Sequence, residues 1–262
     1  FPADTQVDGH SLRRWHESGG DGSERRYGFV VPVASVLREG YEVTALSFDY
    51  GQKHVVELER ASQLIDYLGQ HGHKVHHHVA DLRSATALFQ SHLLSGGEEV
   101  PRGHYEEENM KATVVPNRNA MFASLLYGTA LSVADAHNTD VEVVLGVHSG
   151  DHAVYPDCRP EFYTALEHAF ALGNWDSHRV SFTLPYLTTD KIGILKDAEE
   201  SVERLKVDFD EVFARTITSY QPDEDGRSDG STGSDVERIL AFHAIGREDP
   251  LEYILPWREV LE

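Results

Sequence analysis

The chain of 262 residues is strongly acidic: 44 Asp and Glu against 23 Lys and Arg give a formal net charge of −21. This charge excludes the basic surface of a nucleic-acid-binding protein, and no stretch approaches the roughly 18 apolar residues that span a bilayer. The single cysteine, Cys158, excludes an intramolecular disulfide and a cluster of thiolate zinc ligands. No signal peptide is recognisable in the polar early segment, so we expect a cytoplasmic protein. The acidic, Lys-poor composition is typical of proteins that work in high salt.

Short apolar runs alternate with segments that repeat apolar residues at helical spacing. This alternation predicts an α/β fold with a doubly wound, mostly parallel, five-stranded sheet. We expect an irregular lead-in over residues 1–26, an α/β domain over 27–215 and a C-terminal loop-and-helix appendage over 216–262. The expected strands are 27–33, 43–48, 74–80, 141–145 and 180–185. The expected helices are 34–39, 55–68, 82–94, 119–135, 162–172, one capped by Thr188 or Thr189 and running to 203, and 236–245.

Two polar stretches interrupt this pattern. Residues 95–113 are expected to form a loop, and residues 221–235 (QPDEDGRSDGSTGSD) are acidic and of low complexity, which predicts a surface loop or disorder. The tract His76, His77 and His78 lies in an expected strand, where alternate residues face opposite sides. We therefore expect no metal site there.

Three polar loops flank the expected strands and the long helix. Residues 48–54 (FDYGQKH) follow the second strand, residues 113–119 (TVVPNRN) lead into the helix at 119–135, and residues 146–162 (GVHSGDHAVYPDCRPEF) follow the fourth strand. Ligands of open α/β sheets bind beyond the carboxyl ends of the strands. We therefore expect the three loops to converge on one ligand site.

The first loop offers Asp49 and Tyr50 for a ribose or base, and Gln52 and His54 for further polar contacts. The alternative is a plain turn with Gly51 at positive φ.

In the other two loops, Arg118 and Arg159 suit a bidentate grip on a carboxylate or phosphate. Asp151 and Asp157 can accept hydrogen bonds from ring N–H and amino groups. Cys158 invites a nucleophile interpretation, but no activating base is identifiable, so an inert buried thiol is favoured.

Two alternatives remain open at helix entries. Arg118 could be a solvated side chain at a helix start that Asn117 caps. Lys191, after the last strand, is either a phosphate or adenylate contact or a surface lysine.

Four motifs together, SFDYGQKH, VPRGHYEEENMKATVVPNRN, LGVHSGDHAVYPDCRPEF and LPYLTTDKIGI, resemble the 7-cyano-7-deazaguanine synthase (QueC) family in order and spacing. The ending AIGREDPLEY is also similar, and the resemblance covers about residues 40–205 and, more loosely, 236–253. It implies an adenine-nucleotide α-hydrolase-like, Rossmann-like fold related to ATP pyrophosphatases. It also implies ATP- and Mg²⁺-dependent conversion of 7-carboxy-7-deazaguanine and ammonia to 7-cyano-7-deazaguanine, in queuosine or archaeosine biosynthesis. The partners would be small molecules, and a homodimer is a possible assembly.

The resemblance also implies residue roles. The carboxylate would be activated as an adenylate, ammonia would give the amide, and a second activation would give the nitrile. The catalytic residues would be Arg118, Arg159 and Lys191, the last near the phosphates. Substrate-binding residues would be Asn119, Asp151, Tyr155, Asp157, Cys158 and Arg159, and ATP-binding residues would be Ser18, Gly19, Gly20, Ser23, Asp49, Tyr50, Gln52 and His54.

The sequence departs from the family pattern at both ends. Family members carry a phosphate loop SGGxDS after an apolar strand, whereas here residues 18–23 read SGGDGS and follow no strand, so a glycine-rich lead-in is the alternative. Near the C-terminus the family carries four zinc-binding cysteines, where this chain has Ser219 and residues 228–235 (SDGSTGSD). Hydroxyl groups are poor zinc ligands, so we expect no structural zinc.

These losses leave alternatives to a synthase. The chain could be a catalytically impaired paralogue that binds a deazapurine or a partner protein without turnover. A reading-frame shift could instead explain the N-terminal loss, though not the C-terminal one. Another ATP pyrophosphatase relative, such as a thiolation enzyme, is disfavoured because the chain lacks a cysteine pair.

Overall fold

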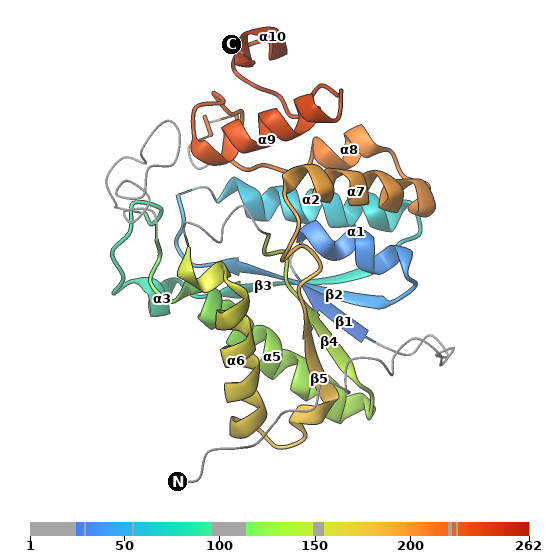
Figure 1. Cartoon of the computed structure of the whole chain (residues 1–262), viewed down its shortest axis with the longest axis vertical. Coiled ribbons are helices and arrows are strands. Elements are labelled where there is room, and N and C mark those ends of the chain that lie inside the picture. Colours follow the sequence, from blue (N-terminus) through green and yellow to red (C-terminus); the bar gives the residue numbers. More distant parts are fainter. Residues whose placement is uncertain are drawn as a thin grey trace.

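The parallel sheet at the centre of the molecule has the strand order β3-β2-β1-β4-β5 (Figure 1). The computed structural model describes residues 25–28, 30–53, 55–95, 114–148, 155–219, 222–223 and 225–261, with only the backbone at 25–28, 30 and 31. The predicted α/β class with parallel strands is confirmed. The strands are β1 (Arg25–Gly28), β2 (Glu42–Asp49), β3 (Val75–Asp81), β4 (Val141–Val144) and β5 (Val180–Thr183).

Helices cover both faces of the sheet, as a doubly wound topology requires (Figure 1). Helices α1, α2 and α7 lie on one face, with α8, α9 and α10 beyond them, and α5 and α6 lie on the other. The strand order reverses between β1 and β4, which is the switch point where such sheets bind ligands. The bounds are α1 (Val30–Arg38), α2 (Val56–Gln70), α3 (Arg83–Thr86), α5 (Arg118–His137), α6 (Pro160–Gly173), α7 (Lys191–Leu205), α8 (Phe209–Phe213), α9 (Gly233–Ala244) and α10 (Trp257–Val260), with short 3-10 turns η3 (Pro156–Cys158) and η4 (Ser177–Arg179).

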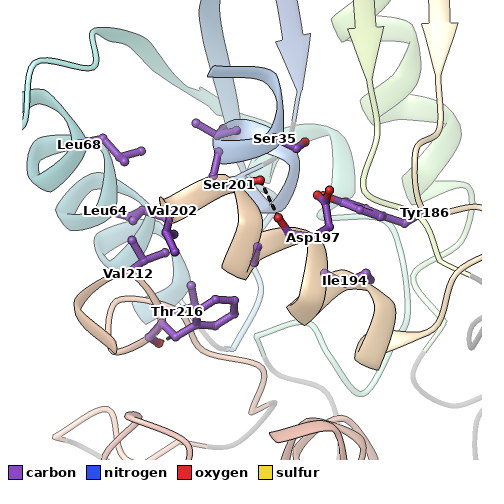
Figure 2. Close-up of a pocket in the computed structure, with 14 residues that line it drawn as sticks. Ser35, Leu64, Leu68, Tyr186, Ile194, Asp197, Ser201, Val202, Val212 and Thr216 are labelled. Atoms are coloured by element: carbon purple, nitrogen blue, oxygen red, sulfur yellow. Dashed lines mark hydrogen bonds between the residues drawn. The ribbon is translucent and has the colours of Figure 1, made fainter. Parts of the chain in front are cut away.

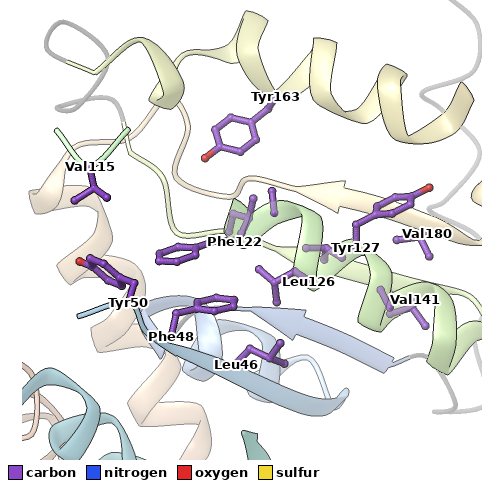
Figure 3. Close-up of a cluster of buried hydrophobic side chains, with 14 of the residues drawn as sticks. Leu46, Phe48, Tyr50, Val115, Phe122, Leu126, Tyr127, Val141, Tyr163 and Val180 are labelled. Atoms are coloured by element: carbon purple, nitrogen blue, oxygen red, sulfur yellow. The ribbon is translucent and has the colours of Figure 1, made fainter. Parts of the chain in front are cut away.

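An aromatic core fixes α5 against the sheet. The rings of Phe48 on β2 and Phe122 on α5 stack with their centroids 4.2 Å apart (Figure 3). Tyr127, one turn further along α5, stacks on Phe170 of α6 at 4.6 Å. Offset aromatic pairs of this kind contribute about 0.5–1.5 kcal/mol beyond their buried area. The Phe48–Phe122 pair places the start of α5 beside the carboxyl end of β2.

The opposite core lies between the sheet and helices α1, α2 and α7. It encloses a small cavity of about 60 Å³, lined mainly by apolar side chains such as Leu64, Leu68 and Val202 (Figure 2). The cavity includes no residue of the predicted site, and we assign it to the core. Helix α9 contributes Phe242 to this same core, so the expected C-terminal appendage packs on the α/β layer.

The predicted boundaries at the N-terminus are wrong. The first strand ends at Gly28 instead of reaching residue 33, and α1 begins at Val30. β-branched residues favour a strand locally, but Val33 and Val36, three residues apart, are both buried in the core under α1. Tertiary packing therefore overrides the local preference. Residues 25 and 26 likewise belong to β1 and not to an irregular lead-in.

Two helix predictions also need correction. Residues 82–94 are not mostly helical, because only Arg83–Thr86 forms a helix and turns follow. The N-cap of α7 is Asp190, whose Oδ1 accepts a hydrogen bond from the backbone N–H of Gly193 at 2.8 Å. Neither expected threonine caps the helix.

Residues 228–235 are wrongly predicted as a surface loop. Ser228, Thr232 and Asp235 are at most 1% exposed.

In the described part of the chain, no helix has the length and apolarity of a membrane span.

Candidate active site

A cleft runs along the carboxyl edge of the sheet. One pocket, of about 350 Å³, lies between Gly146 beyond β4, Lys191 at the start of α7, and α9. A second, of about 200 Å³, lies beyond β2 and against α2. The two pockets share Glu57, Thr216 and Ile217, so they form one continuous site. This is the position at which open α/β sheets bind their ligands.

The segment from Phe213 to Ser219 lies along both pockets, and its residues Thr216 and Ile217 line the two of them. It begins at the last residue of α8 and carries no motif, so its role could not be predicted. We call residues 213–219 the cleft wall.

Asp49 stabilises the turn that follows β2. Its Oδ1 accepts a hydrogen bond from the N–H of Gly51 at 3.2 Å, and its Oδ2 lies 3.4 Å from Nε of Arg83. Gly51 has a φ of 79°, as predicted for the turn. The structure therefore gives Asp49 an architectural role, and a contact with a nucleotide remains a prediction.

Gln52 is 0% exposed and holds three neighbours. Its Oε1 accepts from the N–H of Tyr50 at 2.9 Å, and its Nε2 donates to the carbonyl of Phe48 at 3.1 Å and to Glu57 Oε1 at 2.8 Å. A direct contact of this amide with ATP would require these bonds to break. Gln52 is therefore positioned to orient the Glu57 carboxylate in the cleft.

Sequence reasoning missed Glu57, although its position was a usable signal. It lies in the first turn of α2, the helix that follows β2, and such a turn starts at the carboxyl edge of the sheet. The carboxylate lines both pockets.

Tyr50 and Arg118 form a buried contact at one end of the cleft. The Arg118 guanidinium lies 5.9 Å from the centroid of the Tyr50 ring, which also packs on Phe122. Burial raises the pKa of the Tyr50 phenol, so the hydroxyl stays neutral at physiological pH. Arg118 Nε donates to Asn119 Oδ1 at 3.4 Å. The guanidinium is thus held at the start of α5, although Asn117 occupies the cap position without a side-chain capping bond.

The second and third predicted loops meet through Asn119 and Cys158. Asn119 Nδ2 donates to the Cys158 sulfur over 3.6 Å, and the thiol is buried. An amide cannot take a proton from a thiol, so this contact does not activate a nucleophile. Tyr155 and Asp157 beside it are half-buried, and Arg159 is exposed at the start of α6. The described residues of these two loops are therefore in contact, and their convergence with the first loop on one ligand site remains a prediction.

Lys191 is the basic residue at the start of α7 that faces the larger pocket. Its Nζ lies 2.7 Å from Glu237 Oε2 on α9. Glu237 was not predicted, because the sequence did not indicate that α9 packs on α7. The ion pair holds the lysine head in the cleft.

Six predicted site residues lie outside the described part of the chain: Ser18, Gly19, Gly20, Ser23, His54 and Asp151. In chain order the first four precede β1. A phosphate loop joins the carboxyl end of a strand to the following helix, and here residue 29 alone separates β1 from α1. Their place in the sequence therefore argues against their assignment to the phosphates.

The C-terminal donor set does not fit a zinc ion. The buried groups at residues 228–235 are hydroxyls and the Asp235 carboxylate, whereas structural zinc prefers thiolate and imidazole. The Oγ1 of Thr218 and the Oδ1 of Asp235 are buried and make no hydrogen bond within the described residues. Among those residues no group of three His, Cys, Asp or Glu side chains could hold a metal.

Comparison with known proteins places the chain in a family. The family model described as "Queuosine biosynthesis protein QueC" matches residues 19–246. The "7-cyano-7-deazaguanine synthase 2" of Colwellia psychrerythraea is 44% identical over 218 residues, which are 83% of this chain and 90% of that protein. The "7-cyano-7-deazaguanine synthase" of Pseudoalteromonas translucida is 39% identical over 217 residues, 83% of this chain and 89% of its own. Because the matches span most of the chain and include the loops that form the cleft, the chain belongs to the QueC family.

Proposed function

We propose that this chain is a 7-cyano-7-deazaguanine synthase, which converts 7-carboxy-7-deazaguanine and ammonia to 7-cyano-7-deazaguanine at the expense of ATP. The observation that carries the proposal is identity of 39–44% with synthases of that name over 83% of the chain. The cleft at the carboxyl edge of the sheet supports it, since open α/β sheets bind their ligands at this position.

The reaction has two activation steps. A substrate carboxylate oxygen attacks the α-phosphorus of ATP and releases pyrophosphate. Ammonia then attacks the acyl carbon, and AMP leaves to give the amide. The amide oxygen attacks the α-phosphorus of a second ATP and releases pyrophosphate, and loss of AMP and two protons then gives the nitrile. The first activation brings a carboxylate against the polyphosphate of ATP, and both activations build negative charge on the departing pyrophosphate, so the site must supply positive charge.

The arginines and the polar loop residues supply the substrate end of this site. Arg159 and Arg118 neutralise the carboxylate that is adenylated, and a planar guanidinium can hold it through two parallel hydrogen bonds. Asn119 and Asp157 orient the deazapurine by hydrogen bonds to its ring and amino groups. We assign Tyr155 and Cys158 to the same substrate, and also Asp151, which lies outside the described residues.

The nucleotide end lies between β2, α2 and α7. We assign Lys191 to the phosphates, and Asp49 and Tyr50, at the end of β2, to the adenosine; His54, which lies outside the described residues, belongs to the same assignment. A bound Mg²⁺ would neutralise the phosphate oxygens, and Glu57 is the cleft carboxylate that fits it, because Mg²⁺ uses one or two carboxylates plus phosphates. Gln52 acts through Glu57. We further propose that the chain works without zinc, in the cytoplasm, with small-molecule partners and as a homodimer.

The test is turnover measured by mass spectrometry, with 7-carboxy-7-deazaguanine, ammonium and Mg-ATP in high salt. We expect the nitrile product from the wild-type chain and a loss of at least 100-fold in kcat/KM for Arg159→Ala. Arg258→Ala is the matched control, because Arg258 is an exposed residue of α10. Binding of the acid without AMP release would instead favour a non-catalytic binding module.

A further inference from the structure

Residues 228–235 have the composition of a disordered loop, yet they include some of the most buried polar side chains of the described chain. Thr232 and Asp235 are 1% and 0% exposed. Thr232 Oγ1 donates to Asp235 Oδ2 at 2.5 Å, and the backbone N–H groups of the two residues complete a capping box at the start of α9. The Thr232 hydroxyl and Asp235 Oδ2 bond one another and the helix end, which offsets part of the cost of burial, while Asp235 Oδ1 makes no hydrogen bond within the described residues.

Ser234 joins this cap to the cleft wall. Its Oγ donates to the backbone carbonyl of Thr218 at 2.7 Å and lies 3.2 Å from Thr232 Oγ1. Thr218 belongs to the cleft wall and lines the larger pocket. The first turn of α9 is therefore bonded directly to the backbone of the cleft.

Arg238, one turn further along α9, makes a second connection to the same wall. Its guanidinium forms a bidentate pair with Asp249, with Nε–Oδ2 and Nη2–Oδ1 distances of 2.5 and 2.8 Å. The remaining donors reach Thr216 Oγ1 at 2.7 Å and the Phe213 carbonyl at 3.2 Å. The Phe242 ring lies 5.3 Å from the guanidinium.

Asp249 is itself fully bonded. It accepts from the N–H of Leu251 at 3.0 Å and from the Tyr253 hydroxyl at 2.8 Å. A buried ion pair whose partners are satisfied in this way is costly to break, because one buried charge would be left alone. Arg238 and Asp249 therefore lock the C-terminal segment, α9 and the cleft wall in one arrangement.

The two connections join the same two stretches that the zinc ligands of the family would join, namely the surroundings of Ser219 and residues 228–235. We propose that a metal-free clasp of Thr232, Ser234, Asp235, Arg238 and Asp249 replaces the zinc in this chain and holds the cleft wall at the width that ATP requires. The effect on ATP binding rests on the proposed function, whereas the role of the clasp in holding α9 to the cleft wall does not. Arg238 is thus a positioning residue that acts through Phe213 and Thr216.

The first test uses the purified full chain without any substrate. Elemental analysis should find far less than one zinc per chain, and a chelator should leave the midpoint of thermal unfolding unchanged. Stoichiometric zinc, or a midpoint that falls with the chelator, would overturn the metal-free clasp whether or not the chain is a synthase.

The second test compares Arg238→Met with Arg247→Met. Arg247 makes ion pairs with Glu199 and Asp210 but is 41% exposed, so its loss should matter little. Arg238→Met should lower the unfolding midpoint by about 10 °C. Equal midpoints for the two variants would refute the clasp.

Ser234→Ala covers the case in which Arg238→Met does not fold. It removes the single bond to Thr218 and should lower the midpoint by about 2–4 °C. When Ser234→Ala is assayed at a temperature below its unfolding midpoint, its KM for ATP should be several-fold higher than that of the wild type, while kcat changes less than two-fold. A lower midpoint with an unchanged KM would refute the link to the cleft width. If the wild-type chain shows no synthase activity, the proposed function is overturned and, with it, the ATP part of this proposal.

Discussion

Gln52→Leu tests whether Gln52 positions its neighbours in the site, because in our account the amide acts through Glu57 and does not contact ATP directly. Leucine has nearly the same size as glutamine, so the buried space stays filled, but all three side-chain hydrogen bonds are lost. The N–H of Tyr50 loses its acceptor and the carbonyl of Phe48 loses a donor. Each buried polar group left without a partner costs about 1–3 kcal/mol. Part of this is offset by burial of the leucine side chain, so we expect the free energy of unfolding to fall by about 2–4 kcal/mol.

The assay is urea unfolding followed by circular dichroism in the high-salt buffer. Gln63→Leu is the matched control, because Gln63 lies on the exposed face of α2 and bonds only Glu59 in the described structure. Its effect should stay within about 0.5 kcal/mol. The reasoning is refuted if Gln52→Leu is as stable as Gln63→Leu. The same variant should also raise KM for Mg-ATP, since Glu57 loses its hydrogen-bond donor.

Three further substitutions test single contacts. Cys158→Ala should keep kcat within about three-fold in the turnover assay, and a loss of 100-fold or more would restore the nucleophile interpretation. Glu57→Gln should raise the Mg²⁺ concentration needed for half-maximal turnover, and an unchanged Mg²⁺ dependence would remove Glu57 from the proposed metal contact. Burial lowers the pKa of His77, which bonds Ser47 at 2.8 Å, so the unfolded chain binds a proton first as the pH falls below about 6.5. Wild-type stability should therefore fall more between pH 8 and pH 5.5 than that of His77→Gln in urea unfolding, and equal pH dependence in the two chains would contradict this.

Strand positions were predictable where a buried strand appears in the sequence as a continuous apolar run. Residues 43–48 and 141–145 are apolar runs, and the structure places β2 and β4 there because their side chains fill both cores. The start of α1 was not predictable, since β-branched valines favour a strand until long-range packing is known. Composition likewise misled at residues 228–235, where hydroxyl groups become buried only by bonding one another and the cleft wall.

The candidate site was predictable in part for similar reasons. Position after a strand identified the loops at Asp49 and Cys158, because parallel strands end at one edge of the sheet. The cleft wall and Glu237 were missed because they reach the cleft only through the packing of α8 and α9 on α7. Motifs report residues near the strand ends, whereas the far side of a cleft depends on tertiary contacts.

The most direct test of the account is the ratio of AMP to nitrile in a single reaction. With 7-carboxy-7-deazaguanine, excess ammonium and Mg-ATP, two activations per product predict two AMP formed for each 7-cyano-7-deazaguanine, with the amide as the intermediate after the first. Chromatography with mass spectrometry quantifies all three species. Release of ADP in place of AMP, or a bound acid with no AMP at all, would contradict the assignment of this chain as a synthase.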